Sequence, residues 1–387
     1  MLRYFLLFYC GLIAAASLFA QQQFNETIVH DGLNRSYIVY VPASYNADVP
    51  APLMFNYHGF TDNSANHLAY TDMRPIADTA GFILVYPQGS LLFGFLSHWN
   101  VGSFTNGSTA DDIGFTEAMI DSLSNSYAID SSRVYACGFS NGGYFSFRLA
   151  CELSDRIAAV ASVSGVMSTQ NFNSCSPQRP VPVMSIHGTN DGVVDYNGGN
   201  PAGSLSVDEV LDYWVGHNEL DPEPTITELP DLNSNDNSTV EYQSWRSQDG
   251  CFAVDHYRVD NGTHTWPLVG GNPSERNVDI SASQLIWDFV SQYNLDGPIE
   301  CSPVGTSKVA VPDEQLEAYP NPTDRYLNLA TEQNSFPQTY ELFNTFGQRV
   351  MRGSAILTGE RIDLAGLPAG TYVLVMGQRR VRIVKSK

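Results

Sequence analysis

RVYACGFSNGGYFSFRL, residues 133–149, is the stretch that decides the fold of this chain. An apolar run at 134–137 leads into a G-x-S-x-G pattern made by Gly138, Ser140 and Gly142, and a segment compatible with a helix follows. A serine in this strand–turn–helix context sits on a sharp, strained turn from which its hydroxyl projects. Glycines on either side leave room for the neighbouring backbone. The stretch therefore predicts Ser140 as a nucleophile between a buried strand and a helix.

Apolar runs and helical periods alternate along the chain on both sides of this turn, up to about residue 293. Strands are expected at 35–41, 53–57, 82–86, 158–163, 183–186 and 252–259, and helices at 67–80, 115–123, 207–215 and 282–293. This alternation predicts βαβ units, and hence an α/β fold with a mostly parallel sheet flanked by helices. Ligands of such sheets bind at the carboxyl ends of the strands.

A serine nucleophile needs a base and an acid, which follow it in the order acid, then histidine, in hydrolases built on such a sheet. Asp191 comes just after the expected strand 183–186, where the acid should lie. Asp195 is close enough in sequence to compete, and Asp255 or Asp260 are more distant alternatives. An Asn-Asp-Gly sequence can also simply shape a turn. Asp191 is the predicted acid.

His264 lies in the loop after the last expected strand and is the predicted base. His58 and His187 precede glycines at strand ends, where a histidine can also brace its own loop. The remaining histidines are less suitable because they lie far upstream or within expected elements, or, like His98, near a candidate substrate wall.

Two backbone N–H groups should face the oxyanion that develops when the serine attacks. The residue after the nucleophile normally supplies one, here Asn141. The loop after an early strand should supply the other, and Phe60 is the best candidate. His98 and Trp99 are candidates for a wall that contacts substrate, and Trp266 beside the base is another.

The net charge of −21 and the pI near 4.5 argue against nucleic acid or an anionic membrane surface as a partner. No Cys/His spacing fits zinc, and no Gly-rich phosphate loop is present, so no metal and no cofactor are expected. The loop 231–236 has carboxylates at suggestive spacing, but it lacks the glycine and the glutamate of a calcium loop.

Residues 1–20 have the pattern of a secretory signal peptide, with Arg3 before an apolar stretch and a polar Gln21-Gln22-Gln23 run after Ala20. Export permits disulfides. Cys137 lies in the buried strand before Ser140 and is expected to be a free thiol. The natural pairs are then Cys151–Cys175 and Cys251–Cys301, although sequence alone does not determine connectivity.

The composition changes after residues 296–312, a Pro- and Gly-containing linker that follows an expected domain at 21–295. Residues 313–387 contain nine Lys and Arg against eight Asp and Glu, so this part lacks the acidity of the rest. Its short alternating runs, separated by turn residues, predict a separate small β-sandwich.

Five motifs of the larger domain resemble the secreted α/β-hydrolases of carbohydrate esterase family 1: CGFSNGG, HGTNDGVVDY, GTHTWP, YHGF, and the pair HWN with DDIGF. That family includes feruloyl esterases, acetylxylan esterases and polyhydroxybutyrate-depolymerase-like enzymes, and the resemblance spans about residues 25–295. It implies the α/β-hydrolase fold with Ser140 as nucleophile, Asp191 as acid and His264 as base. It also implies a Cys151–Cys175 disulfide and Trp99 as a wall of the acyl pocket.

The tail is similar to the C-terminal sorting domain of type IX secretion in Bacteroidetes-type bacteria. The residues that carry the similarity are AYPNPTDRYLNL, YELFNTFGQRV, IDLAGLPAGTYVLVM and a basic VRIVK end. The resemblance implies export across the outer membrane, with the tail removed and the enzyme released or attached to the surface. A carbohydrate-binding module is the competing interpretation, but this region has no tryptophan to stack on a sugar.

Together these features predict a secreted serine esterase that forms an acyl-enzyme on feruloyl or acetyl esters of plant or algal polysaccharide. Alternatives are a polyhydroxybutyrate or other polyester depolymerase, a peptidase that uses the same three residues, and a catalytically inactive carbohydrate-binding protein on a hydrolase scaffold.

Overall fold

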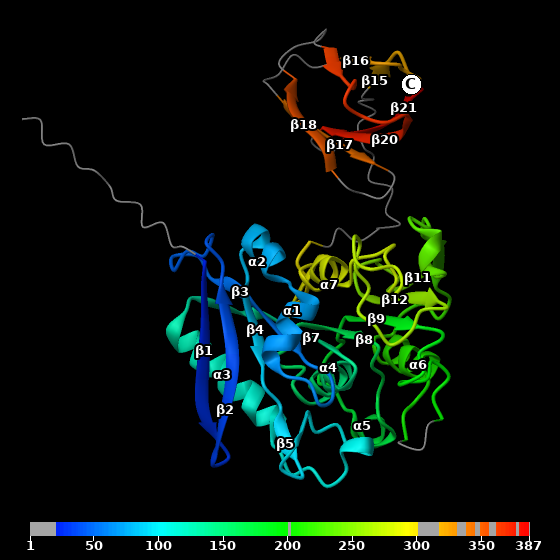
Figure 1. Ribbon diagram of the computed structural model, residues 1–387. Coiled ribbons are helices and arrows are strands. Elements are labelled where there is room, and N and C mark those ends of the chain that lie inside the picture. Colours follow the sequence, from blue (N-terminus) through cyan, green and yellow to red (C-terminus); the bar gives the residue numbers. More distant parts are fainter. Residues whose placement is uncertain are drawn as a thin grey trace, which may run out of the picture. The chain divides into compact units, whose positions relative to one another are not determined.

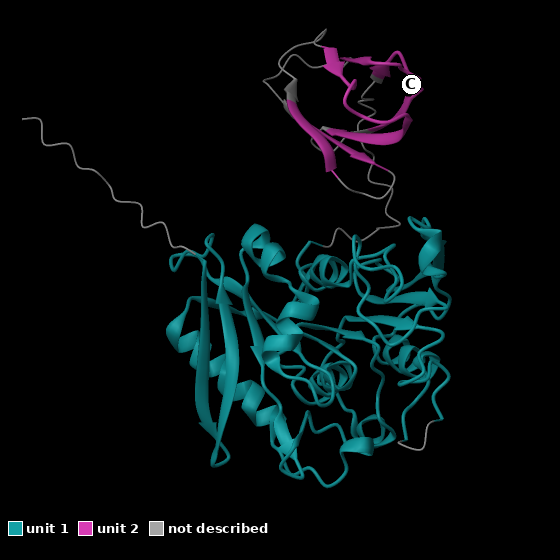
Figure 2. Cartoon of the chain, in the orientation of Figure 1, with its two compact units in different colours: residues 1–304 teal, residues 305–387 magenta. Residues whose placement is uncertain are grey.

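The computed structural model describes residues 21–199, 203–300, 317–330, 338–344, 349–355, 361–376 and 379–386. The chain divides into two compact units, residues 1–304 and 305–387 (Figure 2). The predicted signal peptide and residues 301–312 of the predicted linker lie outside the described residues. Among the helices that are described, none is long and apolar enough to cross a membrane.

A ten-stranded sheet organises the first unit (Figure 1). Its strands follow the order β1 (Gln22–His30), β2 (Leu33–Val41), β4 (Ile83–Pro87), β3 (Ala51–Tyr57), β7 (Ile129–Phe139), β8 (Ala159–Val163), β9 (Val183–Gly188), β12 (Ala253–Asp260), β11 (Thr239–Arg246) and β10 (Thr225–Glu228). All pairings from β4 through β12 are parallel, and the strands at both ends are antiparallel. The prediction of a mostly parallel sheet in an α/β-hydrolase fold is confirmed.

Helices cover both faces of this sheet. They are α1 (Ser64–Thr71), α2 (Arg74–Ala80), α3 (Asp112–Ser126), α4 (Asn141–Glu152), α5 (Thr169–Ser174), α6 (Val207–His217) and α7 (Ala282–Val290). Short 3₁₀ turns η1 (Ser103–Thr105) and η2 (Ser234–Asp236), and the hairpins β5 (Ser90–Leu92)–β6 (Leu96–His98) and β13 (Tyr293–Asn294)–β14 (Gly297–Pro298), complete the unit.

Alternation along the central strands divides the core into two hydrophobic layers. On β7, Val134 and Ala136 face α3, α4 and α6, whereas Tyr135 and Cys137 face α1, α2 and α7. Because consecutive side chains of a strand point to opposite faces, one apolar run such as 134–137 fills both layers. This explains why the run before Ser140 is continuous rather than alternating.

One predicted helix is wrong in its bounds. Residues 67–80 form two helices, α1 and α2, because Pro75 lies in the first turn of α2, where its missing N–H is tolerated. Inside a continuous helix the same proline would remove a hydrogen bond and clash with the preceding turn. Strand β10 is absent from the predicted strands, because its residues are all exposed and no apolar run marks it.

The cysteines are arranged as predicted where the structure describes them. Cys151 at the end of α4 is joined to Cys175 after α5, and Cys137 is free and buried. Cys251 takes part in a disulfide, but Cys301 lies outside the described residues. The pairing of Cys251 with Cys301 therefore stays a prediction.

The second unit has two small sheets, in agreement with the predicted β-sandwich. One contains β15 (Glu317–Tyr319), β16 (Tyr326–Ala330) and β19 (Arg361–Asp363), and the other β18 (Arg349–Ala355), β17 (Gln338–Asn344), β20 (Gly370–Met376) and β21 (Arg379–Lys385). Both sheets contribute to one core, which includes Leu327, Ile362, Leu342, Leu374 and Ile383.

Four of the buried histidines have a lowered pKa and brace the first unit. His58 follows β3, His67 lies on α1, and His187 and His256 lie on β9 and β12. Burial lowers the pKa of each, that of His256 to about 3. These side chains are therefore neutral at neutral pH and act as hydrogen-bonding groups within the core.

These histidines predict that the first unit loses stability as the pH falls below about 6.5. The unfolded chain binds a proton at each histidine in that range while the native state does not, so protonation favours unfolding. Each histidine should lower the free energy of unfolding by about 1.4 kcal/mol per pH unit until its own folded pKa is reached. Urea unfolding between about pH 7.5 and about pH 5.5 measures this. A free energy that stays constant over that range would refute the neutral assignment.

Candidate active site

Ser140 lies at the tip of a strained turn between β7 and α4. Its backbone has φ 54° and ψ −119°, a region that residues other than glycine rarely occupy. The Ser140 N–H donates to the carbonyl of Val163 on β8 (2.9 Å), and its own carbonyl accepts from Tyr144 N–H in the first turn of α4 (3.0 Å). Two neighbouring elements thus hold a conformation that would cost about 1–3 kcal/mol in isolation.

The glycines around Ser140 are required by close backbone packing. A Cβ at Gly142 would overlap the carbonyl oxygen of Tyr57 at the end of β3, and one at Gly138 would overlap the backbone of Gly142. A Cβ at Gly143 would overlap the hydroxyl of Ser162 on β8. The G-x-S-x-G-G pattern therefore lets α4 begin directly against the ends of β3 and β8.

Asp191 and His264 meet beyond the ends of β9 and β12. The Nδ1 atom of His264 lies 2.7 Å from Oδ2 of Asp191. Because a carboxylate can only accept, His264 donates from Nδ1, and its Nε2 is left to act as a base. The aromatic ring of Phe139, one residue before Ser140, packs against the imidazole with 4.8 Å between ring centroids.

The carboxylate of Asp191 is buried and its orientation is determined by the backbone. Its Oδ1 accepts hydrogen bonds from the N–H groups of Val193 (2.9 Å) and Val194 (2.8 Å). Burial alone would raise the pKa of Asp191, but the hydrogen bond and charge of His264, together with His187 and the Val194 N–H, outweigh it and lower the pKa. Asp191 is thus ionised at neutral pH and can stabilise a protonated His264.

His187 contacts the pair formed by Asp191 and His264. This contact was not predicted from the sequence. Its Nε2 lies 2.8 Å from the carbonyl oxygen of Val194 and 3.5 Å from Oδ2 of Asp191. Burial lowers the pKa of His187, so it stays neutral and donates to that carbonyl. It therefore braces the loop that carries Asp191, and its position before a glycine at a strand end was the signal for such a role.

The competing carboxylates have other partners. Asp195 is exposed and caps its own turn at Asn197 N–H (2.9 Å). Asp255 binds Arg246 (2.6 Å), and Asp260 binds Arg258 (3.0 Å). Of the four candidate acids, Asp191 is the one that contacts His264 within the described part of the chain.

The segments that carry the two predicted oxyanion donors both adjoin Ser140. Asn141 is the first residue of α4, so its N–H is one of the helix donors without an intrahelical acceptor. A Cβ placed on Gly59 would lie 3.5 Å from the Cβ of Ser140, which brings the loop that carries Phe60 beside the nucleophile. The side chain of Asn141 is occupied elsewhere: it exchanges two hydrogen bonds with the backbone of Trp99 (2.7 and 3.0 Å).

Trp99, His98 and Trp266 are all at most 1% exposed, which contradicts the predicted substrate contacts of the two tryptophans, whereas His98 lines a cleft described below. Trp99 stacks on Phe145 and donates from its indole N–H to the carbonyl of His58 (2.9 Å). Trp266 donates to the hydroxyl of Ser283 (3.1 Å). These side chains hold the loops around the site in place, and a buried indole cannot form a wall that substrate touches.

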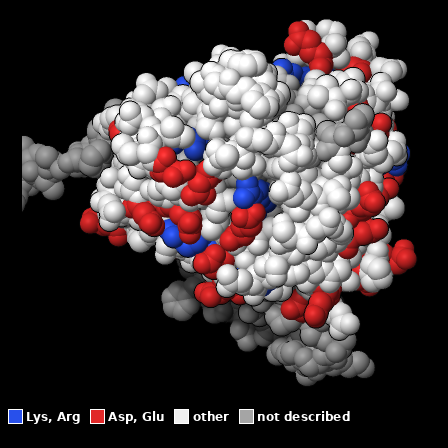
Figure 3. Space-filling model, turned by 90° about the horizontal axis from the view of Figure 1, so that it is seen from below, with Lys and Arg blue, Asp and Glu red and all other residues white. Residues whose placement is uncertain are grey.

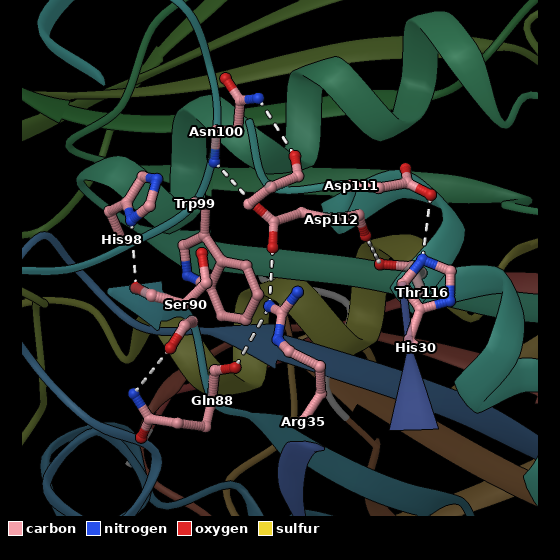
Figure 4. A network of polar contacts seen from close by, with 12 residues as sticks. His30, Arg35, Gln88, Ser90, His98, Trp99, Asn100, Asp111, Asp112 and Thr116 are labelled. Atoms are coloured by element: carbon pink, nitrogen blue, oxygen red, sulfur yellow. Dashed lines mark hydrogen bonds and ion pairs between the residues drawn. The ribbon is translucent and has the colours of Figure 1, made fainter. Parts of the chain in front are cut away.

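The HWN and DDIGF motifs are in contact. The backbone N–H of Asn100 donates to Oδ2 of Asp112 (2.7 Å), and the Asn100 side chain donates to the carbonyl of Ala110 (3.1 Å). Asp112 also forms a buried ion pair with Arg35 (2.7 Å), as Figure 4 shows. No sequence signal pointed to Arg35, which is at least 63 residues away from both motifs.

Within the described part of the chain, no group of three or more His, Cys, Asp or Glu side chains is arranged to hold a metal ion. In the loop 231–236, Asp236 accepts from the N–H groups of Ser238 (2.9 Å) and Val278 (2.9 Å) and so shapes a turn.

Two regions of the chain match known family models. Residues 106–208 match Phospholipase/Carboxylesterase, and residues 317–386 match the Secretion system C-terminal sorting domain. Together with the sheet order and the strained turn at Ser140, the first match makes the N-terminal unit an α/β-hydrolase. The second unit carries a sorting domain, in agreement with export of the chain.

Several curated relatives are esterases by name. The chain is 31% identical over 278 residues to a bifunctional acetylxylan esterase/xylanase of Neocallimastix patriciarum (72% of this chain, 36% of that protein). It is 28% identical over 271 residues to feruloyl esterase B of Piromyces equi (67% and 46%), and 29% identical over 280 residues to feruloyl esterase D of Neurospora crassa (68% and 84%). The chain thus spans less than half the length of the first two relatives.

Solved structures with related names are also similar. An acetyl xylan esterase from Aspergillus awamori has 17% identity and a TM-score of 0.49, with 70% of this chain and 99% of that chain covered. A ferulic acid esterase from Anaeromyces mucronatus has 14% identity and a TM-score of 0.45, with 72% and 92% covered.

The geometry predicts that replacing Asp191 impairs Ser140 far more than replacing Asp195. Asp191→Asn keeps the shape but can stabilise the wrong tautomer of His264, which in serine hydrolases costs on the order of 10⁴ in rate. The rate of labelling of Ser140 by a fluorophosphonate probe is the measurement. Asp195→Asn is the matched control and should label at the wild-type rate. If the control slowed as much as Asp191→Asn, the acid would have to be reassigned.

Proposed function

We propose that the chain is an exported serine carboxylesterase, with Ser140 as nucleophile, His264 as base and Asp191 as acid. The observation that carries the proposal is the 2.7 Å hydrogen bond between His264 and a buried Asp191, on loops at the same sheet edge as the strained turn of Ser140. Attack by a serine requires a base that is held by an acid, because a neutral alcohol is a weak nucleophile until a base takes its proton.

In the proposed reaction, Oγ of Ser140 attacks the ester carbonyl as Nε2 of His264 takes its proton. The backbone N–H groups of Phe60 and Asn141 stabilise the oxyanion, each by about 100-fold or more in rate. The intermediate then collapses, the C–O bond of the ester breaks, and His264 returns the proton to the departing alcohol. Water, deprotonated by His264, releases the acid from the acyl-enzyme in the same way.

The proposed substrates are feruloyl or acetyl esters of plant or algal polysaccharide. The names of the relatives, acetylxylan esterase and feruloyl esterase, support this class over a polyester such as polyhydroxybutyrate. A catalytically inactive binding protein would not need to preserve an ionised, backbone-oriented carboxylate behind a histidine. That arrangement therefore favours an active enzyme.

We also propose that residues 317–386 direct export by type IX secretion machinery, after which this part is removed. The match to the sorting-domain model supports export by this route. Because this unit has a core of its own, its removal need not disturb the catalytic unit.

Ser140→Ala should lower turnover of every accepted substrate by at least about 10⁴-fold, because the nucleophile cannot be replaced by its partners. The measurement is a substrate panel of methyl ferulate, acetylated xylan, polyhydroxybutyrate film, casein and p-nitrophenyl acetate. An unchanged circular dichroism spectrum and unfolding midpoint provide the control for folding. Wild-type rates in the variant would refute the nucleophile, and degradation of the film or casein alone would refute the substrate class.

A further inference from the structure

A cleft of about 950 Å³ lies at the sheet edge, where Thr61 of the loop that carries Phe60 lines it, and it has no role in the reaction described so far. Its lining comes from the β1–β2 turn, the loop after β3, the end of β4, the β5–β6 hairpin and the loop 107–110. All of these segments lie beyond the carboxyl ends of β3 and β4 or beside them, on the edge where ligands of such sheets bind.

The loop that carries the proposed oxyanion donor also forms part of the lining of the cleft. Thr61, which lines the cleft, directly follows Phe60 and donates from its N–H to the carbonyl of Ser97 on β6 (2.7 Å). The ring of Phe60 packs edge-on against Phe104, with 5.7 Å between centroids. The cleft and the proposed oxyanion donor therefore share one loop, which follows β3.

The floor of the cleft is polar and cross-linked (Figure 4). Arg35 is buried and paired with Asp112, and its Cζ lies 4.1 Å from the centroid of the Phe115 ring. His98 joins the hairpin to the loop 107–110, through the carbonyl of Ser90 (3.0 Å) and the hydroxyl of Ser108 (2.6 Å). The ion pair and these hydrogen bonds thus tie the floor to three neighbouring segments.

An exposed aromatic ring forms the rim. Phe93 lines the cleft, is 70% exposed, and has φ 55° at the tip of the β5–β6 hairpin. A Cβ on Gly107 would lie 3.7 Å from its ring, so the ring stands against the opposite loop. Asparagine or glycine would occupy this left-handed backbone at lower cost than a phenyl group. An exposed ring at a strained backbone position points to a contact with a ligand.

The charge of the cleft selects against acidic ligands. Asp31 and Asp62 line it, while its one cationic side chain, Arg35, is neutralised by Asp112. The face seen from below in Figure 1, the side on which β5 lies, shows many more acidic than basic side chains (Figure 3). An uncharged ligand rich in hydroxyl groups fits this lining, because carboxylates, amides and hydroxyls can all bind such groups.

We propose that this cleft binds the uncharged sugar chain that carries the ester, with Phe93 stacked on one sugar ring. The inference rests on the proposed esterase function and adds to it the part of the site that recognises the polymer. It also assigns the β5–β6 hairpin as the element that distinguishes a polysaccharide ester from a small ester.

The test compares Phe93→Asn with Phe95→Asn in the full chain. Phe95 is equally exposed on the same hairpin but does not line the cleft, so it is the matched control. Each variant is assayed on pairs of substrates that share an acyl group: acetylated xylan with p-nitrophenyl acetate, and feruloylated arabinoxylan with methyl ferulate. Phe93→Asn should lower kcat/KM about tenfold on the polysaccharide ester and leave the small ester unchanged. Its unfolding midpoint should not fall, because asparagine suits the left-handed backbone.

Phe95→Asn should behave as wild type on both substrates. Unchanged polysaccharide kinetics in Phe93→Asn, or equal losses in both variants, would overturn the proposal. Binding to the Ser140→Ala protein separates this inference from the reaction: xylohexaose should bind, and should bind about tenfold more weakly when Phe93→Asn is added. Preferential binding of polygalacturonate or phosphatidylcholine vesicles would refute an uncharged sugar as ligand. Xylohexaose binding by a wild-type protein that hydrolyses none of the esters would refute the esterase function alone.

Discussion

The close approach of α4 to the end of β3 is the constraint on which the rest of the site depends. Gly142 packs against the carbonyl of Tyr57 with no room for a Cβ, and this contact starts the helix directly after Ser140. The serine is then forced into a left-handed backbone that β8 and the first turn of α4 hold from both sides. Its hydroxyl projects at the sheet edge because neighbouring elements maintain the strain. Any residue larger than glycine at 138 or 142 would move the helix and the serine with it.

The charged groups of the site are brought together at the same edge of the sheet. Strands β9 and β12 are parallel neighbours, so the loops after them emerge together, and Asp191 and His264 meet although 73 residues separate them. Buried, neutral histidines support this edge: His187 braces the Asp191 loop, and His58 accepts from Gly89 N–H (2.9 Å) after β4. Since each is kept neutral by burial, the negative charge of Asp191 is matched chiefly by the proton that His264 gains during the reaction.

The large aromatic side chains of the site differ in burial, and this separates those that hold loops from those that can touch a ligand. Trp99 and Trp266 attract attention in a sequence because large aromatic residues often contact sugars, but both are buried and hold loops. The exposed rings on the β5–β6 hairpin are Phe93 and Phe95, which lie on either side of Gly94. The exposure of these rings depends on how the hairpin projects from the sheet, and no local sequence pattern indicates it.

The sequence by itself determined the parallel centre of the sheet, the three residues of the proposed reaction, the first disulfide and the separate tail. Each of these has a local signature: an apolar run long enough to fill two layers, a glycine-flanked serine, or a polar residue just after a run. Only the tertiary structure decided which polar groups pair across the edge, such as Arg35 with Asp112 and His187 with the Asp191 loop. It also decided that Trp99 is core rather than wall, and that edge strands such as β10 extend the sheet. The reason is that burial and pairing depend on segments distant in sequence, whose approach is set by the packing of the whole sheet and its helices.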